Sequence, residues 1–334
     1  MKTTSKHIRL YLCLGMILAM LIGAIFLSIG IGAKRISILT IWESIMHYDP
    51  SNGQHIIVRT LRIPRVIVAL AVGASFAVSG ALMQATTRNP MASPSVLGIN
   101  AGAGLGLAVA MVISPNASFN KTVMFSFAGA AVASLFIFGL SYISKTGSSP
   151  LRLALVGTAI TALFNSFSQA LAVYFNISQE LTFWNAGGVS GVRPEQALFI
   201  LPWTVIGLLL ALSISKSVTL LSLGEEVAVG LGGRTRYIKV IACIAVLILT
   251  GSSVAIVGPI GFVGLVVPHA VKFMIGVDYR KVIPFSIFAG AFLVVVADIV
   301  SRSINPPFET PIGAITALIG VPFFIYLAIG KGRS

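Results

Sequence analysis

Few side chains in this sequence have types and spacings that could support catalysis. None of its four histidines lies at metal-ligand spacing from another histidine, a cysteine or an acid within one helix. The motifs GxSxG, HExxH and GxxxxGK[ST] are absent. Cys13 and Cys243 lie far apart in apolar runs, where small core side chains are the simplest interpretation. The residues therefore indicate a protein that is not itself an enzyme and needs no metal or cofactor.

Asp298 is the clearest candidate for a carboxylate inside an apolar run. A buried carboxylate of this kind could serve as a proton relay in an ion-coupled transporter. Arg302 follows four residues later, which is the spacing at which two side chains meet on one face of a helix. A structural ion pair is the favoured interpretation, and the proton relay stays open as the alternative.

Three arginines, Arg59, Arg62 and Arg65, occur in the seven residues RTLRIPR, directly before a long apolar run. Pro64 suits the start of a helix, because its missing N–H costs nothing there. Basic side chains at that position oppose the helix dipole, so helix stability alone does not explain them. They either anchor a helix end among lipid headgroups or form a docking patch for an acidic partner.

The elements that must position these residues are membrane spans. Of the 334 residues 56% are hydrophobic and only 10% are charged, whereas a soluble domain has about 25% charged residues. A water-soluble core cannot bury so much apolar surface, so the chain is a polytopic membrane protein. The net charge of +14 does not indicate nucleic-acid binding, because the basic residues are scattered singly between apolar runs.

The first uncharged run, 10–31, is long enough to cross a bilayer and longer than the apolar region of a secretory signal, which has about 7–15 residues. We therefore expect a retained span, although Ile31-Gly32-Ala33 would be acceptable to a signal peptidase. The run 240–271 contains Gly258-Pro259, where a helix would break, so it is one long span or two segments. The other uncharged runs are 66–87, 89–120, 122–144, 153–179, 196–215, 282–297 and 310–330.

The distribution of lysine and arginine distinguishes the two topologies. Ten spans, with the N-terminus inside, place 15 of the 23 basic residues inside and 8 outside; nine spans place 11 inside and 12 outside. We therefore expect an all-α fold of ten transmembrane helices in a single transmembrane domain, 1–334, with both termini cytoplasmic. The segment 258–271 is then a short, broken helix, and RTLRIPR lies outside the cell.

Small residues recur at helical spacing in two of the runs. Gly73 and Gly80 lie near one face of the run 66–87, and Gly102 and Gly106 are four residues apart in the run 89–120. Such faces allow helix backbones to approach closely.

The longest internal loop, 215–239, is too apolar for a free linker. Glu225 and Glu226 suit the first turn of a helix, and Gly230, Gly232 and Gly233 suit its end. A short amphipathic helix on the cytoplasmic face could lie on lipid, but a lipid-bound helix favours Lys and Arg rather than acids. A protein partner is the stronger interpretation.

The sequence resembles the permease subunits of the ABC importers for ferric siderophores, haem and cobalamin, and most closely the siderophore permeases of Gram-positive bacteria. The matching stretches extend over almost the whole chain. They are LRIPR (61–65), GASFAVSGALMQ (73–84), RNPMASPSVLGINAGAG (88–104), LGEEVAVGLG (223–232), GPIGFVGLVVPH (258–269), GVDYRKVIP (276–284), ADIVSR (297–302) and PFETPIGAITALIGVPFFIYL (307–327).

The resemblance implies two permeases in the membrane, either two copies or one copy with a sister permease. It also implies ABC ATPase subunits below them and an extracellular substrate-binding protein or lipoprotein above. Arg62, Arg65 and Arg302 would face glutamates of that binding protein, while Arg59 lies outside the matched motif. The segment containing Leu223, Gly224, Glu225, Glu226, Gly230 and Gly232 would be the helix that couples to the ATPase.

The resemblance also implies a cytoplasmic gate. Asn89 and Met91 match its first part, where this chain has Met in place of the commoner Leu, and Ser148 and Ser149 match its second part loosely. The function implied is inward movement of an iron–siderophore chelate while a partner hydrolyses ATP, with haem or cobalamin as the alternative cargo. An ion-coupled secondary transporter is the alternative of a different class, and the absence of charge pairs within the spans argues against it.

Overall fold

The computed structural model describes residues 2–32, 35–94, 98–143, 150–306 and 308–330, and within these ranges all regular elements are helices. The short helices are α2 (Ile38–Met46), α3 (Gly53–Ile57), the π-helix η1 (Val58–Arg62), α8 (Ser178–Ala186), α10 (Ser215–Leu223) and α11 (Glu225–Gly230). The longer ones are α1 (Lys2–Gly30), α4 (Ile63–Thr86), α5 (Ile99–Ile113), α6 (Phe119–Ile143), α7 (Pro150–Tyr174), α9 (Pro194–Ser213), α12 (Thr235–Val257), α13 (Val263–Ile275), α14 (Tyr279–Ser303) and α15 (Ile312–Gly330).

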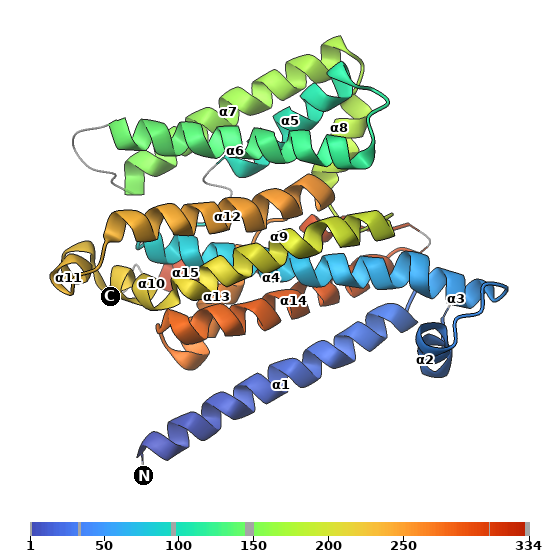
Figure 1. Ribbon diagram of the computed structural model, residues 1–334, viewed down its shortest axis with the longest axis horizontal. Helices are drawn as coiled ribbons and strands as arrows, with labels where there is room; N and C mark the ends of the chain where they lie inside the picture. Colours follow the sequence, from blue (N-terminus) through green and yellow to red (C-terminus); the bar gives the residue numbers. More distant parts are fainter. Residues whose placement is uncertain (1, 33–34, 95–97, 144–149, 307, 331–334) are drawn as a thin grey trace.

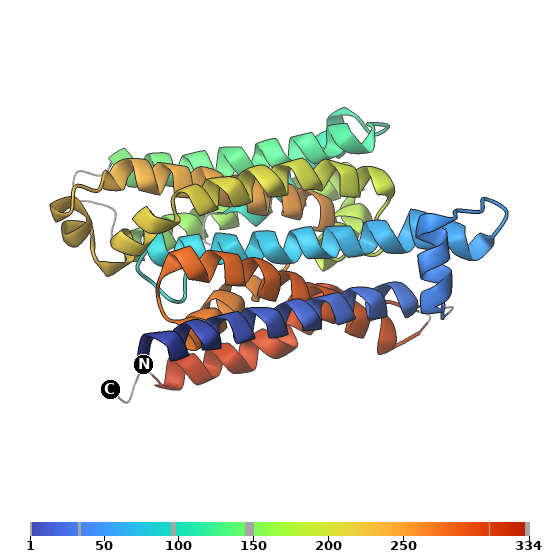
Figure 2. The same ribbon diagram turned by 60° about the horizontal axis from the view of Figure 1, so that its bottom comes forward.

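The long helices run side by side in one bundle (Figures 1 and 2). In the described part of the chain, seven helices are long and apolar enough to cross a membrane, and α5, α13 and α15 are shorter apolar helices. The chain is therefore a multi-pass, all-α membrane protein, as the composition predicts. If each short helix also crosses, the total is ten, and this number stays a prediction.

The helix α4 lies at the centre of the bundle, where it contacts α9, α12, α13 and α14. The most apolar part of α4 and the segment preceding it is 89% buried, whereas that of α1 is only 28% buried. An apolar helix that is exposed on most of its surface is stable in lipid but not in water. The bundle therefore has a protein-covered centre and a periphery, including α1, that faces lipid.

Glycines allow the closest helix contacts, as the small-residue spacing predicts. A Cβ atom on Gly73 would overlap the backbone of Gly290 in α14, and one on Gly80 would overlap the backbone of Gly264 in α13. Gly102 and Gly106 of α5 meet the backbone of α6 in the same way. These contacts bring backbones together at distances that any side chain would prevent.

The run 240–271 divides into two helices. α12 ends at Val257, Gly258 takes a φ of +72°, and α13 begins at Val263. A residue with a side chain is unfavourable at this φ, and a Cβ atom there would also overlap the carbonyl of Trp184. The expected break at Gly258 is thus confirmed.

The helices differ from the uncharged runs of the sequence at two places. The uncharged run 89–120 is not a single helix: it contains α5 (Ile99–Ile113) and the first residues of α6, which begins at Phe119. The chain turns at Asn89–Met91 instead, where the Asn89 side chain accepts a hydrogen bond from the Met91 N–H at 2.9 Å. Asn and Pro favour turns over helices even where no charge interrupts an apolar run.

The second place is Pro64. It lies in the first turn of α4, as predicted, but α4 continues directly from η1. Helical structure runs without interruption from Gly53 through Thr86, with η1 immediately before Pro64. A π-turn, in which the Ile63 N–H bonds to the Val58 carbonyl, changes the hydrogen-bonding register where proline lacks an N–H. The arginines of RTLRIPR therefore lie beyond the first turn of the continuous helical segment, and the dipole argument against a structural role does not apply to them.

Candidate docking and coupling sites

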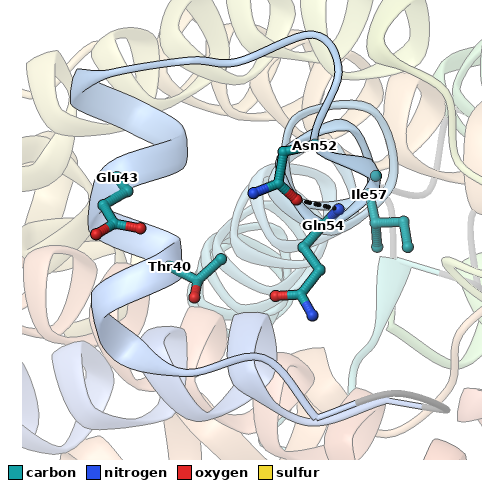
Figure 3. A pocket seen from close by; sticks show the side chains of 6 residues that line it. Thr40, Glu43, Asn52, Gln54 and Ile57 are labelled. Atoms are coloured by element: carbon teal, nitrogen blue, oxygen red, sulfur yellow. Dashed lines mark hydrogen bonds between the residues drawn. The ribbon is translucent and has the colours of Figure 1, made fainter.

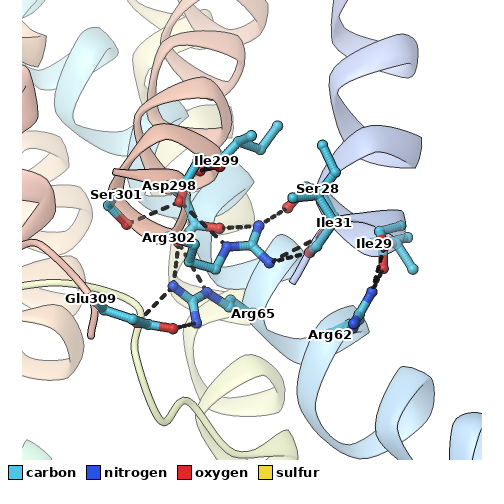
Figure 4. Close-up of polar contacts among 12 residues, drawn as sticks. Ser28, Ile29, Ile31, Arg62, Arg65, Asp298, Ile299, Ser301, Arg302 and Glu309 are labelled. Atoms are coloured by element: carbon cyan, nitrogen blue, oxygen red, sulfur yellow. Dashed lines mark hydrogen bonds and ion pairs between the residues drawn. The ribbon is translucent and has the colours of Figure 1, made fainter. Parts of the chain in front are cut away.

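Arg65 holds two acids together at one end of the bundle (Figure 4). Its Nη2 lies 2.7 Å from Asp298 Oδ1, and its Nη1 lies 2.7 Å from Glu309 Oε1. Nε adds a hydrogen bond of 2.9 Å to Asp298 Oδ1, and Nη2 adds one of 2.9 Å to Glu309 Oε2. One guanidinium thereby links α4, α14 and the segment before α15, with the planar fork geometry that suits arginine.

Arg302 binds the other oxygen of the same carboxylate. Its Nη2 lies 2.8 Å from Asp298 Oδ2, which confirms the predicted helical ion pair. The same guanidinium donates to the carbonyls of Ser28 and Ile31 at 3.2 and 2.9 Å and to Ser28 Oγ at 2.8 Å. Asp298 is fully buried with both oxygens in ion pairs, an arrangement that favours a fixed structural carboxylate over a proton relay.

Arg62 is 7% exposed and donates from Nη1 to the carbonyls of Ile29 and Gly30. These are among the last carbonyls of α1, which lack partners within their own helix. α1 has no basic residue in its own last turn. Arg62 and Arg302 therefore satisfy the end of α1 from neighbouring helices, where positive charge also complements the helix dipole.

We call Arg62, Arg65, Arg302, Asp298 and Glu309 the arginine cluster. Arg65 and Arg302 pair with the two carboxylates, and their side chains are 13% and 8% exposed, whereas Arg62 binds carbonyls at the end of α1. The structure thus brings together the three arginines predicted for docking, and it gives each of them partners within the chain. Sequence reasoning missed Glu309, whose distance of 244 residues from Arg65 leaves no spacing signal.

Glu309 lies in the segment between α14 and α15. Burial raises the pKa of its carboxyl, but hydrogen bonds from Arg65 and Ser190 and the positive charges nearby outweigh burial and leave the pKa below its usual value. The carboxylate is therefore ionised at neutral pH. Its side chain is 32% exposed, the most accessible acid of the cluster.

Arg59 is exposed and lies outside the cluster. Its guanidinium stacks over the ring of Tyr48 at 4.4 Å from the centroid and donates to the Ile45 carbonyl at 3.4 Å. It thus ties the preceding loop and α2 to η1, and it does not contribute to the contacts of Figure 4.

The predicted coupling segment forms two short helices joined at Gly224. Leu223 ends α10, Gly224 takes a φ of +140°, and Glu225 and Glu226 occupy the first turn of α11, as predicted. α11 ends at Gly230, and Gly232 has a φ of +79°. Glycine is the residue that tolerates these backbone angles, which explains the glycines at both ends.

Apolar side chains of this segment are exposed. We call Leu223, Val227, Val229 and Leu231 the coupling patch; their exposed fractions are 60%, 47%, 57% and 65%. Ala228 lies beneath them and is fully buried. The segment is thus attached to the bundle on one side and offers an uncovered apolar surface on the other.

An ion pair holds the coupling segment to α12. Lys239 Nζ lies 2.8 Å from each carboxylate oxygen of Glu225. The hydrogen bond from Lys239 lowers the pKa of Glu225, and this effect outweighs partial desolvation. Any force on α11 can therefore reach α12 through this pair as well as through the chain.

The expected gate is only partly visible. Asn89 and Met91 are half-buried in the turn between α4 and α5. Ser148 and Ser149 lie outside the described residues. Nearby, Lys272 Nζ donates to Gln84 Oε1 at 2.5 Å, a contact between α13 and α4 that the sequence did not indicate.

The described residues contain no group of three or more His, Cys, Asp or Glu that could hold a metal ion.

Comparison with known proteins identifies the family to which this architecture belongs. The model of the FecCD transport family matches residues 20–330. The chain belongs to this family.

Relatives of this FecCD permease in Bacillus subtilis (strain 168) cover most of its length. The iron(3+)-hydroxamate import system permease protein FhuB is 47% identical over 308 residues, which are 92% of this chain and 80% of the relative. The iron-uptake system permease protein FeuB is 43% identical, over 92% of each chain. The Fe(3+)-citrate import system permease protein YfmD is 44% identical, over 92% of this chain and 91% of the relative.

A solved structure has the same fold as this FecCD permease. It is described as an inward-facing conformation of a metal-chelate type ABC transporter, with a TM-score of 0.83 and 28% sequence identity. The match covers 95% of this chain and 99% of that chain. The chain is thus a transport permease of the ABC type.

Proposed function

We propose that this chain is the non-catalytic permease subunit of an ATP-driven importer that moves iron–siderophore chelates into the cytoplasm. The observation that carries the proposal is 47% identity, over 92% of the chain, to a permease named for iron(3+)-hydroxamate import. ATP hydrolysis would occur on separate ATPase subunits, and an external binding protein would deliver the chelate. The whole chain, 1–334, would act as one permease domain beside a second copy or a sister permease.

The coupling patch would contact the ATPase. Four large apolar side chains on a short cytoplasmic segment would stay in water without a partner, which is unfavourable. An apolar groove in the ATPase would cover them. The backbone link through Gly224 and the Glu225–Lys239 pair would then transmit ATPase closure to α12. The turn at Asn89 and Met91, together with Ser148 and Ser149, would form the cytoplasmic gate.

Arg62, Arg65 and Arg302 would form the landing site for acids of the binding protein. Because Arg65 and Arg302 already form ion pairs within the chain, an acid of the binding protein would have to compete with these pairs. The three arginines outnumber the two carboxylates of the cluster, which therefore keeps an excess of one positive charge. A partner's glutamate would approach this positive end of the bundle and compete with Glu309, the more exposed of the two acids.

The test is uptake of radioactive iron by cells that lack this gene and carry either the native chain or a variant at equal membrane abundance. Hydroxamate, catecholate and citrate chelates of iron are supplied separately. Native-dependent uptake of one of them, which persists when the proton gradient is collapsed and ATP is preserved, supports the proposal. Loss of uptake on collapse of the gradient would indicate an ion-coupled transporter instead.

The variant in this test carries Val227→Asp and Leu231→Asp, which place charges in the coupling patch. The matched control is Val277→Asp, at an exposed position (60%) between α13 and α14, outside the patch. We expect the double variant to abolish uptake and the control to retain it. Uptake of haem or cobalamin, with no uptake of any iron chelate, would overturn the proposed cargo.

A further inference from the structure

The helix α2 lies across the direction of the bundle, near the end of α1 and beside α3 (Figures 1 and 2). Seven residues separate the end of α1 from the start of α2. Ser37 caps it, with Oγ accepting from the Thr40 N–H at 3.1 Å. A helix that crosses a bundle of membrane spans lies roughly parallel to the membrane plane.

One face of α2 is apolar and exposed. Its side chains recur at the helical spacing i, i+1, i+4, i+7 and i+8, and their exposed fractions lie between 42% and 69%. We call this set the α2 apolar face. It consists of Ile38, Leu39, Trp42, Ile45 and Met46.

The other two sides of α2 face a polar groove and a small core. Thr40 and Glu43 face a polar groove of about 480 Å³, which is also lined by Asn52, Gly53, Gln54 and Ile57 (Figure 3). Ile41 is 1% exposed and packs in a small core with Ile29, Ile36, Val58 and Val66. α2 is therefore attached to the bundle by Ile41, and its apolar face points away from the groove.

The surroundings of α2 identify what covers this face. The outer part of α1 exposes Ile22, Phe26 and Leu27 by 42% to 56%, and an apolar span exposed in this way faces lipid. The α2 apolar face lies next to the end of this lipid-facing surface and carries no charge. Tryptophan is enriched at the boundary between membrane and water, where its ring sits at the level of the headgroups.

We propose that the α2 apolar face is embedded in the interfacial layer of the adjacent lipid leaflet, with the Thr40–Glu43 side facing water. An amphipathic helix lying in the interface plane is a known mode of membrane attachment. Here it anchors the segment 53–62, because Arg59 contacts both Tyr48 and the Ile45 carbonyl. The arginine cluster follows directly along the same helix and is thereby kept at a fixed height above the bilayer.

The test uses Trp42 as its own reporter. The chain has three tryptophans, so Trp184→Phe and Trp203→Phe leave Trp42 alone. The full chain is reconstituted in phosphatidylcholine vesicles whose acyl chains carry bromine either near the headgroup or near the chain end. We expect shallow bromine to quench Trp42 fluorescence more strongly than deep bromine, and aqueous iodide to quench it weakly.

Two controls calibrate the depth. In a background with all three native tryptophans replaced by Phe, Phe26→Trp reports a lipid-facing position in α1, and Pro50→Trp reports the exposed loop before α3. The first should respond to brominated lipid and the second to iodide. Trp42 that behaves like position 50 would overturn the proposal. Protection of Trp42 from both quenchers would also overturn it, because a protein surface, either a second copy or a binding protein, would then cover the face.

A second measurement serves if the tryptophan replacements prevent folding. Trp42→Cys, with Cys13→Ser and Cys243→Ser, allows a nitroxide label at position 42 in the otherwise native chain. We expect collisions with oxygen, which partitions into lipid, to exceed collisions with a water-soluble nickel complex. The reverse order would contradict the lipid assignment. Neither measurement depends on transport, so its result is independent of the proposed cargo.

Discussion

The arginine cluster and the coupling patch were both predicted as contact surfaces for partners, yet they are built in opposite ways. The cluster consists of charged side chains that are largely buried and paired within the chain. The patch consists of apolar side chains that are mostly exposed. Charges desolvated by the fold must be paired, whereas exposed apolar groups need an external cover.

Because the two sites are built differently, substitutions in the cluster should affect the stability of the fold, and substitutions in the patch should affect the binding of a partner. Substitutions in the cluster should first change how firmly α1, α4 and α14 hold together, because the cluster connects these three helices. Substitutions in the patch should leave the fold unchanged and alter only what it binds. The comparison can therefore be tested by measuring stability and uptake for the same variants.

The largest effect is expected for Asp298→Ala. This change leaves Arg65 and Arg302 without their shared carboxylate in a site where Asp298 is fully buried. Breaking a buried ion pair from one side costs about 3–5 kcal/mol. Thermal unfolding in lipid nanodiscs should show a clear fall in Tm. The control is Glu43→Gln, an exposed acid that lines the groove beside α2; equal Tm values for the two variants would show that the cluster is not structural.

A packing substitution provides a reference for that effect. Gly80→Val would place a side chain against the backbone of Gly264 and force α4 and α13 apart. Overpacking of this kind costs about 1–3 kcal/mol. Gly23→Ala is the control, because a Cβ atom at Gly23 meets no atom within 4 Å. A smaller loss of Tm for Asp298→Ala than for Gly80→Val would mean that the ion pairs matter less than close packing.

Substitutions in the coupling patch should change partner binding and leave stability nearly unchanged. Val227→Asp with Leu231→Asp adds charges at positions that are 47% and 65% exposed, so the free energy of unfolding should change by no more than about 0.5 kcal/mol. Co-purification of the ATPase should fall by about tenfold, equivalent to about 1.4 kcal/mol. Unchanged co-purification would show that the ATPase binds elsewhere, and a large fall in Tm would show that the patch is part of the core.

The sequence predicted local features well. The small-residue faces, the break at Gly258, the Asp298–Arg302 pair and the acids that begin α11 all depend on neighbours within a few residues. Helical spacing and glycine conformation are sufficient to predict such features.

Contacts between distant segments could not be predicted in this way. Arg65 meets Asp298 across 233 residues, and Arg62 meets the Ile29 carbonyl across 33. Backbone carbonyls carry no sequence signature, so the partners of Arg62 have no pattern to find. The helical structure of α3 and η1, which continues into α4, was also hidden, because charged residues interrupt the apolar run without interrupting the helical segment.

The smallest stability effect is expected for Glu309→Gln. The pair with Arg65 is partly exposed, so its loss should cost at most about 1 kcal/mol. The pKa of Glu309 is lowered in the folded chain, so the pair stabilises the fold fully above the usual carboxyl pKa and is lost as the pH falls through the lowered value. The native chain and the variant should therefore differ by a constant amount from neutral pH to about pH 5 and converge only in more acidic solution.

The same variant tests how the cluster binds its partner. If Glu309 competes with an acid of the binding protein for Arg65, then Glu309→Gln should raise the affinity for the binding protein, by up to about fivefold, while it slightly lowers stability. Arg65→Gln should lower both. Affinity measured on nanodisc-embedded permease separates these outcomes. An affinity that Glu309→Gln leaves unchanged and Arg65→Gln lowers would mean that the arginine positions the surface without contacting the partner, and that its two acids are permanent neighbours rather than competitors.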